Sequence, residues 1–188
     1  MTNARELGRR ERKKGATRSA LTDAAFRLFL ERGYDNVTLR EIAEAADVSV
    51  TTLMNHFPRK EALVFSQQTE HESGLIAAVT QRPSGTSVVH ALREHIIGIS
   101  ARISTNPEVG SFRQLVLDTP ALGDYQHQIW MRRKGALAEA ITDSSDVPRN
   151  RAIAIAHFAV DIIELATTCD DANAVTAAAL DILDHGWG

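Results

Sequence analysis

Apolar side chains recur along most of this chain with the period of an α-helix. Leu21, Ala25, Leu28 and Phe29 have the i, i+4, i+7, i+8 spacing of one apolar helix face. Gly33 follows at a position where helices often end. Runs that alternate apolar and polar residues, as half-buried strands do, are missing from the sequence. The pattern therefore predicts an all-α fold.

Two short helices are predicted directly after the first. Thr38 and Glu41 have the spacing of a capping box, in which each side chain covers an unpaired backbone N–H of the other. Ser49 is a typical first residue of another helix, which reaches about Phe57 before Pro58 interrupts it. A turn of a few residues joins the two helices. This pattern is typical of a helix-turn-helix.

The remainder of the chain reads as further helices, three of them with proline at the start. Their expected bounds are 60–80, 87–105, 107–118, 121–143, 148–169 and 173–185. The prediction is thus about nine helices in three parts. These are a basic disordered arm over residues 1–16, a three-helix domain over 17–62 and a helical domain over 63–188 for ligand binding and dimerisation.

Charge is distributed unevenly along the chain. Residues 1–60 hold 12 Lys/Arg and 8 Asp/Glu, whereas residues 61–188 hold 9 and 16, so a net charge of +4 is followed by one of −7. A basic arm beside a small domain favours contact with phosphates, although a solvated tail has the same composition.

The second helix of the predicted pair carries short polar side chains that suit a DNA groove. Asparagine can bond to adenine through two hydrogen bonds, and a threonine methyl can meet the methyl group of thymine. An ordinary helical hairpin with a polar face is the alternative. The candidate base-reading residues are Val50, Thr51, Thr52, Asn55 and His56.

The stretch VTLREIAEAADVSVTTLMNHFPRKEAL over residues 37–63 resembles the signature of the tetracycline-repressor (TetR) family. The preceding DAAFRLF at 23–29 and RGY at 32–34 are also similar to the family's first helix and its ending. The resemblance covers about residues 17–65. It implies a transcription regulator that binds DNA.

The resemblance also implies roles for single residues. Thr38, His56 and Lys60 occupy positions that contact phosphates in the family, and Arg40 a position that reaches a base or a phosphate. Three residues depart from the pattern, and one of them, Arg59, replaces the usual small polar cap before Lys60 and Glu61. Met54 stands where the family usually has tyrosine, so a hydroxyl donor is missing. Asp47 replaces the usual turn glycine, at some cost in a left-handed conformation.

The second half offers apolar residues for an effector cavity with a few polar groups. The candidates are Phe112, Val116, Tyr125, Ile129, Trp130, Phe158 and Ile162. A packed core is the alternative for most of them. The stretch from Arg113 to Leu122 resembles family branches with acyl-CoA-type effectors. The effector is therefore expected to be an apolar or amphipathic small molecule.

The last two helices are rich in alanine, which allows helices to approach closely. The resemblance implies a homodimer through a four-helix bundle of these helices, and two reading heads then favour a palindromic operator. The candidate interface residues are Ala159, Ile163, Ala178 and Leu180.

These patterns together predict a regulator of transcription, most simply a repressor that a small molecule releases from a DNA operator. An activator, or a DNA-binding regulator without an effector, is the alternative. The sequence lacks a nucleophile elbow, a phosphate loop and a zinc motif, so we expect no enzyme, no cofactor and no metal. A single cysteine and the lack of a long apolar run predict a cytoplasmic protein without a membrane span.

Overall fold

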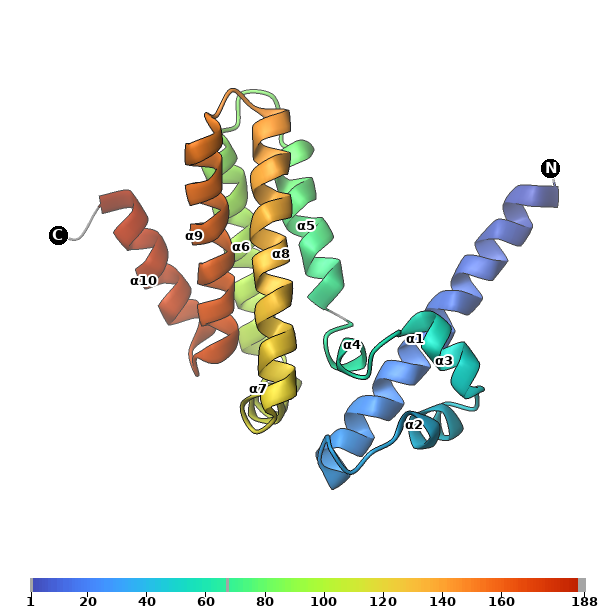
Figure 1. The fold of residues 1–188 in the computed structure, drawn as a ribbon. Coiled ribbons are helices and arrows are strands. Elements are labelled where there is room, and N and C mark those ends of the chain that lie inside the picture. Colours follow the sequence, from blue (N-terminus) through green and yellow to red (C-terminus); the bar gives the residue numbers. More distant parts are fainter. Residues whose placement is uncertain (1, 67, 186–188) are drawn as a thin grey trace. The chain divides into compact units, whose positions relative to one another are not determined.

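The computed structural model describes the backbone of residues 2–66 and 68–185, with most of their side chains. These residues form helices only, in two compact units, residues 1–67 and residues 68–188. The first unit contains α1 (Thr2–Arg32), α2 (Leu39–Ala45), α3 (Val50–His56) and α4 (Glu61–Val64). The second contains α5 (Gln68–Thr80), α6 (Val88–Thr105), α7 (Glu108–Leu117), α8 (Pro120–Ser144), α9 (Arg149–Thr168) and α10 (Ala172–His185) (Figure 1). The all-α fold with an N-terminal helix-turn-helix is as predicted.

The structure differs from the prediction at both ends of the first unit. Residues 2–16, predicted to be a disordered arm, belong to α1 in the structure. The arginine, lysine, glutamate and alanine residues of this segment all have high helix propensity. The helix predicted over 60–80 is divided into α4 and α5, so the described residues form ten helices. The chain leaves helical geometry at Phe65 (φ −99°, ψ 13°), whose side chain is buried in the first unit.

One apolar face of α1 forms the base of the first unit. Leu21, Ala25 and Phe29 are buried, in agreement with their helical spacing. The inward residues of the following helices also lie in this core, including Ile42 of α2 and Leu53 of α3. Each short helix is therefore fixed by at least one apolar side chain, and its opposite face is left to solvent.

Helices α5, α6, α8 and α9 of the second unit lie side by side (Figure 1). α8 packs on α5 and α9, and α10 packs on α6 and α9. Small residues on α9 allow this close approach, since Ala152, Ala156 and Ala159 are buried against the core. Two hydrogen bonds also join segments of the second unit that are far apart in the sequence. Arg82 donates to the Ser144 carbonyl oxygen at 2.8 Å, and the buried Ser100 hydroxyl donates to the Ala172 carbonyl oxygen at 2.7 Å.

Among the helices that the structure describes, each is too short or too polar to cross a lipid bilayer.

Candidate nucleic-acid interface

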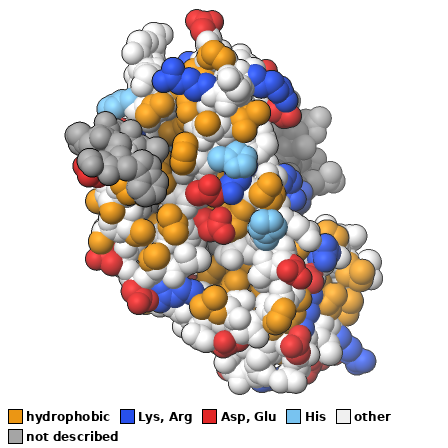
Figure 2. Space-filling view, turned by 60° about the vertical axis from the view of Figure 1, so that its left-hand side comes forward, with side chains coloured by type: hydrophobic (Ala, Val, Ile, Leu, Met, Phe, Trp, Pro, Cys, Tyr) orange, Lys and Arg blue, Asp and Glu red, His pale blue; other side chains and the backbone are white. Residues whose placement is uncertain are grey.

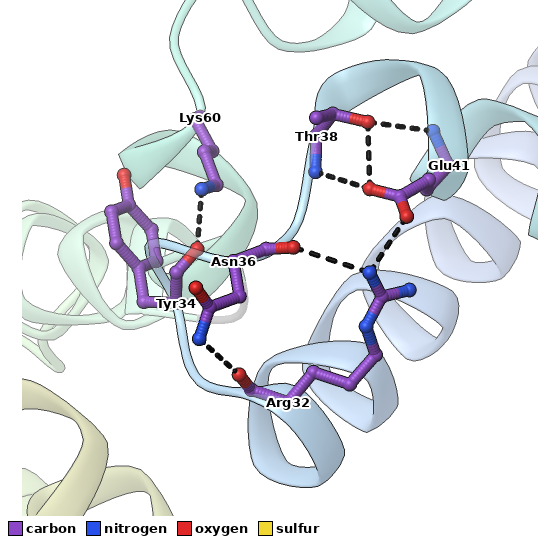
Figure 3. Close-up of polar contacts among 6 residues, drawn as sticks. All are labelled: Arg32, Tyr34, Asn36, Thr38, Glu41 and Lys60. Atoms are coloured by element: carbon purple, nitrogen blue, oxygen red, sulfur yellow. Dashed lines mark hydrogen bonds and ion pairs between the residues drawn. The ribbon is translucent and has the colours of Figure 1, made fainter.

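The start of α2 is fixed by the capping box that the sequence predicts. The Thr38 hydroxyl accepts a hydrogen bond from the Glu41 backbone N–H at 3.3 Å, and the Glu41 carboxylate accepts from the Thr38 backbone N–H at 2.8 Å. Arg32 at the end of α1 pairs with the same carboxylate at 2.7 Å and donates to the Asn36 carbonyl oxygen (Figure 3). This network ties the loop between α1 and α2 to both helices.

These contacts change the acidity of Glu41. The backbone and hydroxyl of Thr38, followed by Arg32, lower the pKa of the Glu41 carboxyl from 4.5 to about 2. Because the pKa is lower in the folded chain, the stabilisation is complete above pH 4.5 and is lost as the pH falls toward 2. We therefore expect the wild-type melting temperature to fall between pH 4.5 and 2 more steeply than that of Glu41→Gln. Parallel curves by circular dichroism would contradict this linkage.

The turn between α2 and α3 has the strained geometry predicted for it. Asp47 has a φ of +53°, in the left-handed region that glycine usually occupies. The Val48 backbone N–H donates to the Ala43 carbonyl oxygen at 3.0 Å, which closes the turn. Ser49 then caps α3, accepting from the Thr52 backbone N–H at 3.1 Å. The direction of α3 is thus set by backbone contacts on both sides of the turn.

α3 presents a continuous exposed face with the helical spacing i, i+1, i+4, i+5. Leu53 is fully buried on the inner side, whereas Val50, Thr51, Met54 and Asn55 are exposed, Met54 by 51%. Short polar and apolar side chains on one face of a helix suit the base edges of a major groove about 12 Å wide. Val50, Thr51 and Asn55 therefore lie where the sequence analysis expects base-reading residues, and Met54 lies among them.

Thr52 and His56, the other two candidates on α3, are only half-exposed. The Thr52 hydroxyl lies 2.8 Å from the Ser49 hydroxyl, and the His56 carbonyl oxygen accepts a hydrogen bond from Arg18 at 3.4 Å. The Thr52 hydroxyl is thus engaged at the start of α3, whereas the contact of His56 with Arg18 uses its backbone only. Both residues stay predictions as DNA contacts.

The two candidates at the start of α2, Thr38 and Arg40, differ in how readily they can leave their present partners for a phosphate. Thr38 is exposed, but its hydroxyl lies 2.7 Å from the Glu41 carboxylate, which competes with a phosphate for the same proton. Arg40 is exposed and pairs with Glu44 at 2.9 Å. Exposed pairs of this kind contribute little to stability. Arg40 can therefore leave Glu44 and pair with a phosphate at little cost in free energy.

Lys60, predicted to contact phosphate, is held inside the first unit. Its ammonium group donates to the Tyr34 carbonyl oxygen and lies 4.0 Å from the centroid of the Tyr34 ring (Figure 3). Burial lowers the pKa of this amine. Lys60 thus fixes the start of α4 to the loop that follows α1. The signature alone does not reveal this role, because a lysine at a helix start serves either purpose.

We expect Lys60→Ala to destabilise the protein by about 1–2 kcal/mol, since a charge-assisted hydrogen bond and ring contact are lost. Chemical unfolding followed by circular dichroism measures the change. Lys14→Ala, which removes an exposed lysine, is the control and should leave stability unaltered. Unchanged stability of Lys60→Ala, together with a weaker salt dependence of DNA binding, would instead favour a phosphate contact.

Arg18 belongs to this site and was missed by the sequence analysis. Its guanidinium carbon lies 4.3 Å from the centroid of the Phe57 ring, in addition to the hydrogen bond to His56. Arg18 thus joins α1 to the end of α3. Its position three residues before Leu21, on the buried face of α1, is the signal that distinguishes it from the surrounding basic residues.

The predicted effector residues of the second unit are divided by the structure. Val116, Ile129, Trp130 and Ile162 are buried, and Phe112 and Tyr125 are half-buried. Phe158, however, is 55% exposed, and its assignment to an effector cavity stays a prediction. Its helix is apolar on more than one side, and spacing does not tell which side faces inward.

An open groove of about 300 Å³ lies along α8 and α9, and the seven predicted effector residues do not line it. Charged and apolar side chains share its walls. Its lining residues are Met131, Lys134, Gly135, Ala138, Glu139, Thr142, Arg149, Ile153 and His157. The Lys134 ammonium group in this groove lies 2.5 Å from the Asp161 carboxylate, which neutralises its positive charge.

The predicted dimer residues are also divided. Ala159, Ile163 and Leu180 are buried in the core of the protomer, and their assignment to an interface between protomers stays a prediction. Ala178 is exposed. The exposed apolar residues described on these helices are Ile153, Ala154, Phe158 and Leu165 on α9 and Ala174, Ala177, Ala178 and Ile182 on α10. Figure 2, with the side of the molecule that carries α10 turned forward, shows hydrophobic side chains gathered among a few charged ones.

Comparisons with known proteins agree with this geometry. Residues 21–66, which contain the helix-turn-helix, match the family "Bacterial regulatory proteins, tetR family". The HTH-type transcriptional regulator TcmR of Streptomyces glaucescens is 32% identical over 96 residues, 51% of this chain and 42% of TcmR. The HTH-type transcriptional repressor Rv1474c of Mycobacterium tuberculosis is 30% identical over 132 residues, 68% of this chain and 64% of that protein.

The chain thus covers less than two thirds of either relative. Among solved structures, the SmeT–triclosan complex has a TM-score of 0.54 at 18% identity and covers 87% of this chain and 91% of SmeT, which shows the shared fold. The capped α2, the strained turn and the exposed face of α3 lie within the residues that the family model matches. Residues 21–66 are thus a helix-turn-helix of the TetR type, and the matched relatives are HTH-type transcriptional regulators, not enzymes.

Proposed function

We propose that this protein is a dimeric repressor that binds a palindromic operator and is released from it by a small molecule in the cytoplasm. The observation that carries the proposal is the exposed face of α3, held on a scaffold whose turns and caps are fixed. A rigid recognition helix favours sequence-specific binding, because little conformational entropy is lost when it enters the groove. Repression is supported by the name of the relative Rv1474c.

The dimer is supported by the outer face of α9 and α10. Phe158 is an aromatic side chain exposed in the protomer, and Ala154 and Ala178 are small exposed residues on the same two helices. Contiguous apolar surface of this kind is typical of interaction sites, and small residues allow two helix pairs to pack closely. A two-fold dimer through this face carries two copies of α3 and so matches a palindromic operator.

The effector is supported by buried polar groups in the second unit. Trp130 is 2% exposed, and its indole N–H lacks a hydrogen-bond partner among the described residues; the same holds for the buried Thr176 hydroxyl. Buried donors are generally satisfied, and a small molecule with an acceptor beside either group would satisfy that group. SmeT, whose fold this chain shares, has a structure with triclosan. The proposal is limited to an apolar or amphipathic molecule, since specific support for an acyl-CoA is lacking.

Binding titrations on DNA upstream of its own and neighbouring genes test the proposal. We expect one palindromic segment to be bound at least 10³-fold more tightly than random DNA at physiological salt. A small molecule that releases the protein must have different affinities for its two states, so its affinity should fall when operator is present. Equal affinity for operator and random DNA would contradict specific regulation, and a reporter gene that rises with the protein would indicate an activator.

A further inference from the structure

α1 continues far beyond the domain that it supports. Its first described contacts with other helices of the first unit are made by Arg18, and its buried face begins at Leu21. Residues 12–16 are exposed, and a Cβ atom built on Gly8 or Gly15 would meet no atom within 4 Å. Residues 2–16, called here the basic extension, are therefore helical without a described neighbour in the protein.

The basic extension has a net positive charge, whereas the remainder of the chain is acidic. It contains six Lys/Arg and two Asp/Glu, a net charge of +4, whereas the chain as a whole has a net charge of −3. Residues outside it therefore total −7. A helix with this net charge, whose described side chains at residues 12–16 are exposed, fits an anionic partner.

The position of the basic extension relative to α3 identifies that partner. Arg18 contacts His56 and Phe57 at the end of α3, and Lys14 lies one helical turn before Arg18 on α1. At a rise of about 1.5 Å per residue, Arg12, Lys13 and Lys14 lie on the order of 6–9 Å further along the same axis. Phosphates border both sides of a major groove about 12 Å wide. Lys14, on the face of Arg18, thus comes within reach of a bordering strand when α3 enters the groove, and Arg12 and Lys13 lie beside it on other faces of the same helix.

We propose that the basic extension is a second DNA-binding element, which holds the phosphate backbone beside the groove that α3 reads. The proposal rests on DNA binding by α3 as inferred above, and adds a contact that carries no sequence information. Its effect is on affinity and on the rate of encounter, since positive charge attracts all DNA alike and compensates for the acidic remainder of the chain.

The triple variant Arg12→Gln, Lys13→Gln, Lys14→Gln tests this proposal in the full-length protein. Glutamine keeps the helix propensity and removes the charge. Each lost phosphate contact reduces the slope of log K against log salt by about 0.9, so we expect the slope to become shallower by about 2–3. Affinity at physiological salt should fall on the order of 10- to 100-fold, to a similar extent on random and operator duplexes. An unchanged slope would overturn the proposal.

A matched control separates local contact from net charge. Arg132, Arg149 and Arg151 are exposed residues of the second unit, and their triple replacement by glutamine removes the same charge at another place. The proposal requires the control to keep the wild-type slope, and an equal loss in both triples would overturn it. Random DNA suffices for these slopes. Failure to find an operator would therefore contradict specific regulation without deciding the role of the basic extension.

Discussion

Replacement of Phe158 by glutamate is expected to separate the dimer into folded protomers. The Phe158 side chain is 55% exposed in the protomer, so the replacement should change the stability of the protomer little. In the proposed interface the same position is covered by the partner. Removing an unpaired carboxylate from water costs several kcal/mol, in addition to the lost burial of an aromatic ring.

The adjacent residue provides a sharp control. Ala159 is only 5% exposed and belongs to the core cluster of the second unit, so Ala159→Glu should unfold the protomer and not merely separate it. Sedimentation velocity measures the assembly, and circular dichroism measures the fold. Operator affinity of Phe158→Glu should fall at least 100-fold, because one reading head is left per molecule. A dimer that persists in both Phe158→Glu and Ala178→Glu would place the interface elsewhere.

The contrast between Phe158 and Ala159 shows where periodicity stops being informative. On α1, apolar residues occupy one stripe, and the buried face was predicted correctly from Leu21, Ala25 and Phe29. α9 is apolar on two sides, one for its own core and one facing outward. Spacing groups residues into stripes, but it does not say which of two apolar stripes faces the core. The sequence pattern therefore leaves open which side of α9 faces outward.

Capping and turn chemistry were predictable because they are local. Thr38, Glu41, Asp47 and Ser49 each act on backbone groups within about four residues, so the sequence contains both partners of each contact. The role of Lys60 depends on Tyr34, 26 residues earlier, and only the packed domain brings the two together. Contacts between side chains and residues this far apart in the sequence cannot be read from local patterns.

The basic extension shows the same ambiguity for charge. Arginine and lysine are typical of disordered arms and are also good helix formers, and composition alone does not separate the two. Continuity with the packed part of α1 favours the helix, since a helix already nucleated is extended at little cost.

Replacement of Asn55 by alanine is expected to reduce operator affinity by about 1–3 kcal/mol, which is on the order of 5- to 150-fold. Asn55 is exposed on the reading face of α3, one residue after Met54 and one turn after Thr51. An asparagine that bonds to a base edge through both its amide groups loses both bonds on truncation. Affinity for random DNA should change little, because no particular base is recognised there.

Arg40→Ala is the matched comparison for Asn55→Ala. Arg40 is exposed at the start of α2 and pairs only with the exposed Glu44 in the described contacts, so its loss should not disturb the fold. If it holds a phosphate, affinity falls alike on operator and random DNA, and the slope against salt becomes shallower by about 1. Titrations of both variants on both duplexes at matched salt distinguish reading from anchoring. Equal losses for Asn55→Ala on the two duplexes would show that Asn55 holds the backbone, and the reading residues would then be sought at Thr51 and Met54.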